Sequence, residues 1–336
     1  MKIVVQTAGV KTVIGIERQN NKELTPMANV YEIVTNRIIE LLDKGVVPWN
    51  RPWTHKVGNG GFSQYNFITK KPYRGINPWL LLATAEEKGY SSPYWLSYKQ
   101  CQEKGGQVRK GEKSTLVIFW KFLSKAAVNA DGTPALNKDG NAKFKTVPML
   151  RYFSVFNIEQ CDGIEAPAAK VDESPVKDLS PINACEHIMS LYATCPKINH
   201  GSNRAYYSPD PDTITMPDQD QFTSMEKYYC VLFHEAAHST GHESRLHRSN
   251  FLNYFGSNDY GKEELVAEMT AAFLCAITGI ENNTIENNAA YVASWKKTIK
   301  ADTKMVVLAA AQAQKAADYM QGIIHEEHKA DLSLAL

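Results

Sequence analysis

Two histidines four residues apart constrain the fold of this chain more than any other feature. His234 and His238 enclose Glu235 in an H-E-x-x-H pattern that follows an apolar run. Residues four apart lie one turn above each other on a helix, so both imidazoles can face one cation. A capping-box pattern at 223–226 and a helix stop at Gly241 predict that helix independently. The pattern therefore predicts a divalent-metal site on a helix.

Glu235 is the candidate catalytic residue of this site. A bound cation lowers the pKa of water to roughly 7, and a neighbouring carboxylate that is not a ligand can accept the released proton. Such sites use a third protein ligand. A histidine at position 244 would complete the metzincin pattern, but the chain has Ser244 there. The third ligand is therefore expected on a second element.

A helix at residues 262–274 is the expected second element, because its apolar positions recur at helical spacing. The spacing puts Glu264 and Glu268 on one face, and the segment resembles the ligand-bearing helix of gluzincins. On this interpretation Glu264 is the third metal ligand and Glu268 orients a ligating histidine. Glu268 and Glu263 remain alternative ligands. The competing interpretation is a solvated helix start, which acidic residues favour on their own.

The length of 336 residues fits two domains better than one. Residues 28–160 carry 19 basic and 10 acidic side chains, a balance of +9, whereas the whole chain has a net charge of +1. Residues 161–180 have the Asp-, Glu-, Pro- and Lys-rich composition of a linker. The expected organisation is an extension at 1–27, a domain at 28–160, this linker, and a domain at 181–336.

The predicted fold class is α+β, with a mixed α/β N-terminal domain and a mainly helical C-terminal domain. Within the first domain, periodicity predicts a helix at 30–42, strands at 114–121 and 149–156, and a loop or hairpin excursion at 127–146. No apolar run approaches the roughly eighteen residues of a membrane span, and the N-terminus lacks a signal-peptide pattern. We therefore expect a cytoplasmic protein with no membrane partner.

Positive charge and aromatic side chains occur together in the N-terminal half. Proteins that bind single-stranded nucleic acid hold phosphates with cations and stack bases on aromatic rings. A peptide-recognition surface and a plain aromatic core are the competing interpretations. The candidate DNA contacts are Trp49, Arg51, Trp53, Tyr73, Arg74, Trp79, Arg109, Lys110 and Lys113.

Several segments, taken together and in order, resemble the ArdC antirestriction family. They are GVVPWNRPW at 45–53, YRGINPW at 73–79, GQVRKGEK at 106–113, AYYSP at 205–209, and the metal-site segments 234–245 and 263–273. The resemblance implies an N-terminal domain that binds single-stranded DNA and a C-terminal zincin-like metallopeptidase domain. It also implies a bacterial protein of plasmids and other mobile elements that protects incoming DNA from host restriction.

The same resemblance implies roles for individual residues. His234, His238 and Glu264 would hold zinc, with manganese or iron as alternatives, and Glu235 would be the general base. The segment Asp212–Met216 resembles the edge strand along which zincins lay an extended substrate. The implied partners are single-stranded DNA and, in addition, restriction-modification enzymes.

Three functions remain open at this point. The favoured one is an antirestriction protein that binds single-stranded DNA and carries the H-E-x-x-H metal site. The second is a DNA-tethered zinc metallopeptidase that cleaves host proteins, and the third is an adaptor that inhibits restriction enzymes by direct binding. A metal site is necessary for hydrolysis but not sufficient, so the sequence favours DNA binding over proteolysis as the core function.

Overall fold

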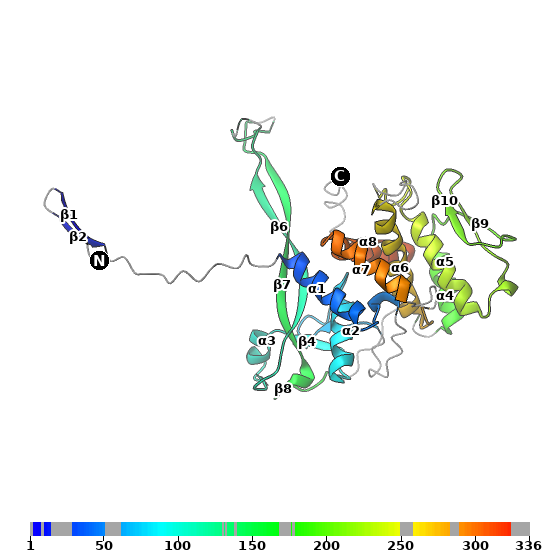
Figure 1. The fold of residues 1–336 in the computed structure, drawn as a ribbon, viewed down its shortest axis with the longest axis horizontal. Helices are drawn as coiled ribbons and strands as arrows, with labels where there is room; N and C mark the ends of the chain where they lie inside the picture. The colour runs from blue at the N-terminus through cyan, green and yellow to red at the C-terminus, as the bar shows by residue number, and fades with distance from the viewer. Residues whose placement is uncertain are drawn as a thin grey trace.

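The computed structural model describes residues 3–7, 10–14, 29–50, 62–129, 131, 133–137, 140–167, 176, 179–248, 258–282 and 289–323. Its longest strands belong to the N-terminal half, and most of its helices belong to the C-terminal half (Figure 1). The predicted α+β fold class is confirmed. Among the described helices, none combines the length and the apolarity that a membrane span requires.

A four-stranded sheet with the order β3-β4-β7-β6 organises the N-terminal half. The strands β3 and β4 are parallel, and the other pairs are antiparallel. A separate hairpin, β1 (Ile3–Thr7) with β2 (Val10–Ile14), lies within the predicted N-terminal extension. The remaining elements are α1 (Val30–Asp43), η1 (Pro48–Asn50), β3 (Tyr65–Asn66), α2 (Asn77–Lys88), β4 (Tyr94–Leu96), α3 (Tyr98–Glu103), β5 (Gln107–Val108), β6 (Thr115–Ala126), β7 (Phe144–Asn157), η2 (Ile158–Gln160) and β8 (Cys161–Asp162).

The strands β6 and β7 form a long ribbon that projects beyond the rest of the sheet (Figure 1). Pairing runs without interruption from Thr115 opposite Val155 to Ala126 opposite Phe144. The sequence predicted both strands but ended the first at 121 and began the second at 149, and it predicted a loop or a hairpin excursion at 127–146. The observed strands are longer, and their pairing is that of a hairpin. The outer part was missed because Ser124, Lys125 and Lys145 interrupt the apolar pattern there with polar residues that have low strand preference.

The C-terminal half consists of five helices, as far as the structure describes it, and a small sheet with the order β10-β11-β9. The predicted edge strand at 212–216 corresponds to β11, which is the central strand, so that prediction is wrong. No sequence pattern indicates β9, a half-exposed three-residue strand that pairs with β11 in parallel. The elements are α4 (Pro181–Leu191), β9 (Lys197–Asn199), β10 (Tyr206–Ser208), β11 (Thr213–Thr215), η3 (Gln219–Gln221), α5 (Met225–Ser239), α6 (Asn258–Thr278), α7 (Ala289–Ala301) and α8 (Met305–Met320).

The two halves are consecutive in the chain, but they share one hydrophobic core. That core includes Val34 and Ile38 of α1 together with Phe273 of α6. The ring of Trp79 in α2 packs against Phe273, with 5.1 Å between the ring centroids. Helix α1 also packs against α7 and α8. The N-terminal half therefore forms one wall of the helical layer that carries the predicted metal site.

Candidate metal centre

Helix α5 presents the two histidines of the H-E-x-x-H pattern on one side. It begins after Ser224, whose side chain accepts a hydrogen bond from the backbone of Lys227, one residue later than the predicted cap. Buried apolar residues such as Phe233 hold the helix against its neighbours. The ring centroids of His234 and His238 are 4.8 Å apart, and the two rings are nearly perpendicular. Their Nε2 atoms are 3.2 Å apart.

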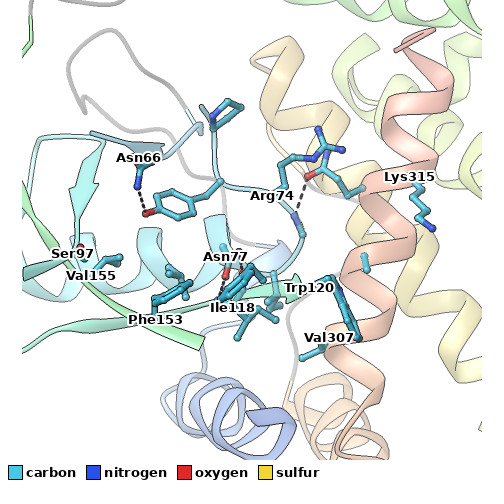
Figure 2. A pocket seen from close by; sticks show the side chains of 18 of the residues that line it. Asn66, Arg74, Asn77, Ser97, Ile118, Trp120, Phe153, Val155, Val307 and Lys315 are labelled. Atoms are coloured by element: carbon cyan, nitrogen blue, oxygen red, sulfur yellow. Dashed lines mark hydrogen bonds between the residues drawn. The ribbon is translucent and has the colours of Figure 1, made fainter. Parts of the chain in front are cut away.

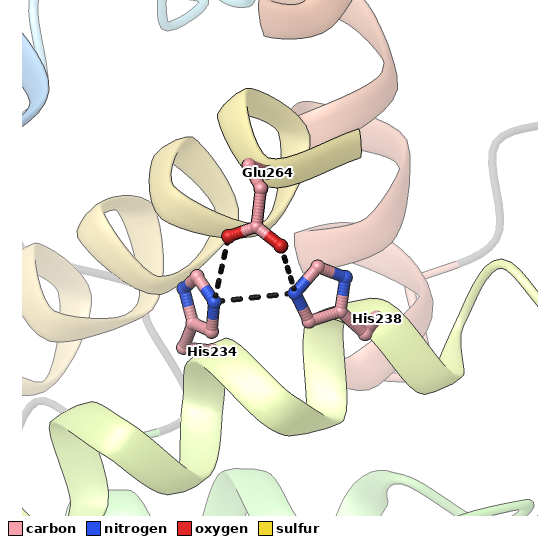
Figure 3. Close-up of side chains that lie close together, drawn as sticks. All are labelled: His234, His238 and Glu264. Atoms are coloured by element: carbon pink, nitrogen blue, oxygen red, sulfur yellow. Dashed lines mark hydrogen bonds and ion pairs between the residues drawn. The ribbon is translucent and has the colours of Figure 1, made fainter. Parts of the chain in front are cut away.

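Glu264 of α6 faces both histidines (Figure 3). Its two carboxylate oxygens each lie 3.5 Å from one Nε2 atom, Oε2 from His234 and Oε1 from His238. All three donor groups offer atoms within 4.8 Å of one another. Two neutral imidazoles and a carboxylate form the donor set of catalytic zinc sites that keep an open position. The residues present therefore fit a divalent metal ion.

The electrostatics of His234 also fit a cation. Burial disfavours its charged form, but the hydrogen bond to Glu264 and the charges of Glu235, Glu264 and Glu268 raise the pKa of His234 to about 9. Its Nδ1 atom is buried and has no hydrogen-bond partner among the described residues. The negative charge of three carboxylates thus favours a positive charge at this point of the structure.

Glu263 lies behind His238 rather than on the side that faces Glu264. Its Oε1 atom is 3.4 Å from Nδ1 of His238, and its Oε2 atom accepts a hydrogen bond of 2.9 Å from Nε of Arg248. Burial raises the pKa of Glu263, but the charge of Arg248 and the hydrogen bond to His238 outweigh it and lower that pKa below its usual value. Glu263 therefore lies outside the group of converging donors, which contains His234, His238 and Glu264, and it does not occupy the place of the third ligand in this arrangement.

Glu268 is buried one turn further along α6, where its partners come from other parts of the chain. Its Oε2 atom accepts a hydrogen bond of 2.9 Å from the indole of Trp49 and another from the hydroxyl of Tyr291. Burial raises the pKa of Glu268 to about 7. Glu268 was predicted to orient a histidine or to be an alternative ligand, but its carboxylate accepts hydrogen bonds from Trp49 and Tyr291 instead. Through its hydrogen bond with Trp49, Glu268 links α6 to η1 of the N-terminal half.

Glu235 is 8% exposed and follows His234 on the same helix. The negative charge of Glu235 contributes to the raised pKa of its neighbour His234. Arg248 was not predicted from the sequence. It lies ten residues after His238, and no spacing rule links an arginine there to the motif.

The predicted DNA contacts divide into three groups in the structure. Trp49 and Trp79 are 0% and 1% exposed, so both rings belong to the core and cannot stack on a base in this conformation. Their prediction as DNA contacts is wrong, because aromatic composition does not distinguish a platform from a core. Arg51 and Trp53 lie outside the described residues.

The remaining predicted contacts are at least partly accessible. Arg74 forms an ion pair with Asp318 of α8, and Tyr73 beside it is half-buried. Arg109 pairs with Glu112 at 3.1 Å and lies near Asp162, so acidic groups neutralise it. Lys110 and Lys113 are exposed. Of the predicted cations among the described residues, Arg74 and Arg109 thus have acidic partners.

Comparison with known proteins agrees with this architecture. Residues 185–312 match a family described as zincin-like metallopeptidase, and residues 28–156 match the N-terminal domain of the anti-restriction factor ArdC. Fold and site thus define a zincin-like protein with an ArdC-type N-terminal half. Crystal structures of antirestriction protein ArdC from plasmid R388, one metal-free and one Mn(II)-bound, each share 36% identity with this chain. Each covers 88% of this chain and 97% of its own, with a TM-score of 0.66. The chain belongs to the ArdC family, and the resemblance is confirmed.

Two further proteins have sequences related to this chain. A DNA primase TraC of Escherichia coli is 38% identical over 297 residues, which are 86% of this chain and 27% of TraC. An uncharacterized protein of Sinorhizobium fredii is 34% identical over 297 residues, 87% of this chain and 91% of its own length. The chain spans only about a quarter of the TraC relative that it matches.

Proposed function

We propose that this protein protects incoming DNA from restriction by combining a metal-dependent peptidase site with a surface for single-stranded DNA. The observation that supports the peptidase site is the convergence of three donors within 4.8 Å. His234, His238 and Glu264 would hold the ion, which we propose to be zinc, with manganese or iron as alternatives. A cation held there would supply Lewis acidity, which polarises a carbonyl group and acidifies water.

The surrounding residues would prepare this site for hydrolysis. Glu263 accepts a hydrogen bond from Nδ1 of His238, which leaves the Nε2 lone pair of that ring facing Glu264. The charge of Arg248 helps to hold the pKa of Glu263 below its usual value. Glu235 would accept the proton of the attacking water and return it to the leaving amine. The strand β10 is an edge of the small sheet and packs against α5, so an extended peptide would pair with β10 rather than with β11.

Two substitutions in the full-length chain test the peptidase proposal. Glu264→Gln should lose zinc binding in calorimetry, whereas Glu235→Gln should keep zinc binding and lose cleavage of casein or restriction-enzyme subunits. Glu243→Gln, which changes an exposed carboxylate near the site, is the matched control and should behave like the wild type. Cleavage by Glu235→Gln at the wild-type rate would contradict the assigned role of Glu235.

DNA binding is the second part of the proposal. It is supported by the match of residues 28–156 to the ArdC N-terminal domain and by the balance of +9 in residues 28–160. The protein would then act in the bacterial cytoplasm, where an entering strand meets restriction enzymes. Anisotropy of a labelled single strand and of its duplex, over a salt series, tests this part. A preference for the single strand that weakens with salt is expected.

Protection assays separate the three hypotheses for the biological role. If Glu235→Gln still protects incoming DNA, shielding of the strand is the main activity, and loss of protection supports the DNA-tethered peptidase. The adaptor hypothesis predicts that restriction subunits remain bound to the protein after nuclease treatment.

A further inference from the structure

The charged residues of the β6–β7 ribbon are distributed unequally over its two faces. In an antiparallel pair, directly opposite residues point to the same face, and successive residues alternate between faces. Phe119 is opposite Arg151, Lys121 is opposite Met149, and Lys125 is opposite Lys145. All four cations of the two strands, Lys121, Lys125, Lys145 and Arg151, therefore lie on one face, which we call the cationic face.

The opposite face of the ribbon has no charged side chain. It carries residues such as Trp120 opposite Leu150 and Ala126 opposite Phe144. Near the body of the protein, Trp120 packs edge-on against Tyr31 of α1, with 6.4 Å between the ring centroids. Neither β6 nor β7 contains an aspartate or a glutamate. The four exposed cations of the cationic face thus have no acidic neighbour within the ribbon.

Two stacked aromatic rings lie on the cationic face, with Phe119 opposite Arg151 and Phe153 one step nearer the body of the protein. The ring centroids of Phe119 and Phe153 are 4.5 Å apart, and the angle between the ring planes is 12°. Phe153 is 55% exposed, which is unusual for a phenylalanine. One step further toward the body, Val117 and Val155 pack against Leu81 of α2. The stack is therefore fixed at its base and open at its outer side.

A cavity of about 650 Å³ begins beside this stack. It lies between the sheet, which contributes Phe153 and Val155, and helix α8, which contributes Val307 and Lys315 (Figure 2). Its other lining groups include the half-buried ring of Tyr73. A volume of this size accommodates a small organic group. Phe119 and Phe153 both line this cavity, so the cavity adjoins the face of the ribbon that carries the four cations.

We propose that a single strand of DNA binds along this path, with its phosphates on the cationic face and an unpaired base against Phe153 at the mouth of the cavity. This inference rests on the proposed DNA-binding function and locates it on the molecule. Exposed aromatic faces take up unstacked bases, which a duplex does not offer without distortion. The surface around Arg109 is a weaker candidate, because Glu112 and Asp162 lie beside that arginine.

The aromatic part of the inference is tested on the ribbon itself. In the full-length protein, Phe153→Ala should weaken binding of labelled oligothymidine roughly 5- to 150-fold, as expected for the loss of one base stack. Phe144→Ala is the matched control, because Phe144 is 62% exposed on the opposite face of the same ribbon. The control should bind like the wild type. Both side chains are exposed, so neither change should affect folding.

The electrostatic part is tested by charge removal. Replacing the four cations of the cationic face by glutamine should weaken strand binding and reduce the salt dependence, lowering the slope of log K against log salt by up to about 3. A control variant removes four exposed lysines of the C-terminal half, Lys197, Lys227, Lys297 and Lys300, and has the same net charge. It should keep most of the wild-type affinity and slope.

The outcomes separate this inference from the function on which it rests. If the wild type does not bind oligothymidine, both the DNA-binding proposal and this inference fail. If it binds but Phe153→Ala equals Phe144→Ala, or the two charge variants weaken equally, DNA binding stands and its location on the ribbon is wrong. Tighter binding of duplex DNA, or of an acidic peptide, by the same face would overturn the assignment to single strands.

Discussion

At the scale of single residues, the roles of the three carboxylates on α6 follow from the atoms that they face. Glu264 faces the Nε2 atoms of both histidines, Glu263 faces Nδ1 of His238, and Glu268 faces away toward Trp49. All three carboxylates lie within two turns of one helix. Sequence spacing alone could not assign these roles, because each depends on what other elements place next to the side chain.

Glu263→Gln should weaken zinc binding without abolishing it. The amide still reaches His238, but it no longer provides the negative charge that makes the ring a better ligand. Loss of an orienting partner typically costs 10- to 100-fold in metal affinity. Competition with a chromogenic chelator measures this loss. Glu243→Gln should leave the affinity unchanged, and equal affinity of Glu263→Gln and the wild type would show that Glu263 has no orienting role.

The raised pKa of His234 predicts how the stability of the metal-free protein depends on pH. The pKa is about 9 in the fold against an ordinary value of 6.5, so the folded state holds this proton more tightly than the unfolded state does. The stabilisation of the fold by this protonated histidine is complete below pH 6.5 and is lost as pH rises through 9. The free energy of unfolding in a chelator should therefore fall over this range, on the order of 3 kcal/mol at most.

Urea unfolding at a series of pH values, with a chelator present, measures this dependence. His234→Gln should remove most of the decrease, whereas His187→Gln, a change on α4 away from the site, should retain it. With zinc in place of the chelator, affinity should instead rise over the same range, because the ion competes with the proton. A flat profile for the chelated wild type would contradict the assignment to His234.

At the scale of elements, the sequence predicted the helices of the metal site better than their surroundings. Helical periodicity and the H-E-x-x-H spacing are local properties, so α5 and the position of Glu264 on α6 were accessible from residue order. The central position of β11 was not, because it depends on the short strand β9 from another part of the chain. The burial of Trp49 was equally inaccessible, since its partner Glu268 lies 219 residues away.

Trp49→Phe tests the contact between η1 and α6. The substitution keeps an aromatic ring in the core but removes the indole donor of Glu268, and loss of a hydrogen bond to a buried group costs about 1–3 kcal/mol. Urea unfolding should show this loss. A double-mutant cycle with Tyr291→Phe, which removes the second donor, should show coupling.

The same Trp49→Phe variant also tests the corrected role of this tryptophan. Because the ring lies in the core, the folded variant should bind oligothymidine with wild-type affinity. Weaker strand binding at unchanged stability would restore Trp49 as a DNA contact.

At the scale of the whole molecule, the shared core predicts that the N-terminal half is not an independent folding unit. A fragment of residues 28–160 would expose the rings of Trp49 and Trp79, which are buried in the intact chain partly against Trp295 and Phe273. We expect no cooperative urea transition for this fragment and strong binding of a hydrophobic dye. A fragment of residues 28–325 should unfold like the intact chain. A sharp transition for 28–160 with native-like near-ultraviolet circular dichroism would refute the prediction.

The shared core also bears on how such genes recombine. A crossover that joined an ArdC-type N-terminal half to an unrelated partner would leave the rings of Trp49 and Trp79 without a complementary surface. The reciprocal product, which keeps the C-terminal half, would have Glu268 without its indole donor. Selection would therefore favour transfer of both halves as a single cassette. The match to TraC fits this pattern, because it includes 86% of the present chain within a protein several times its length.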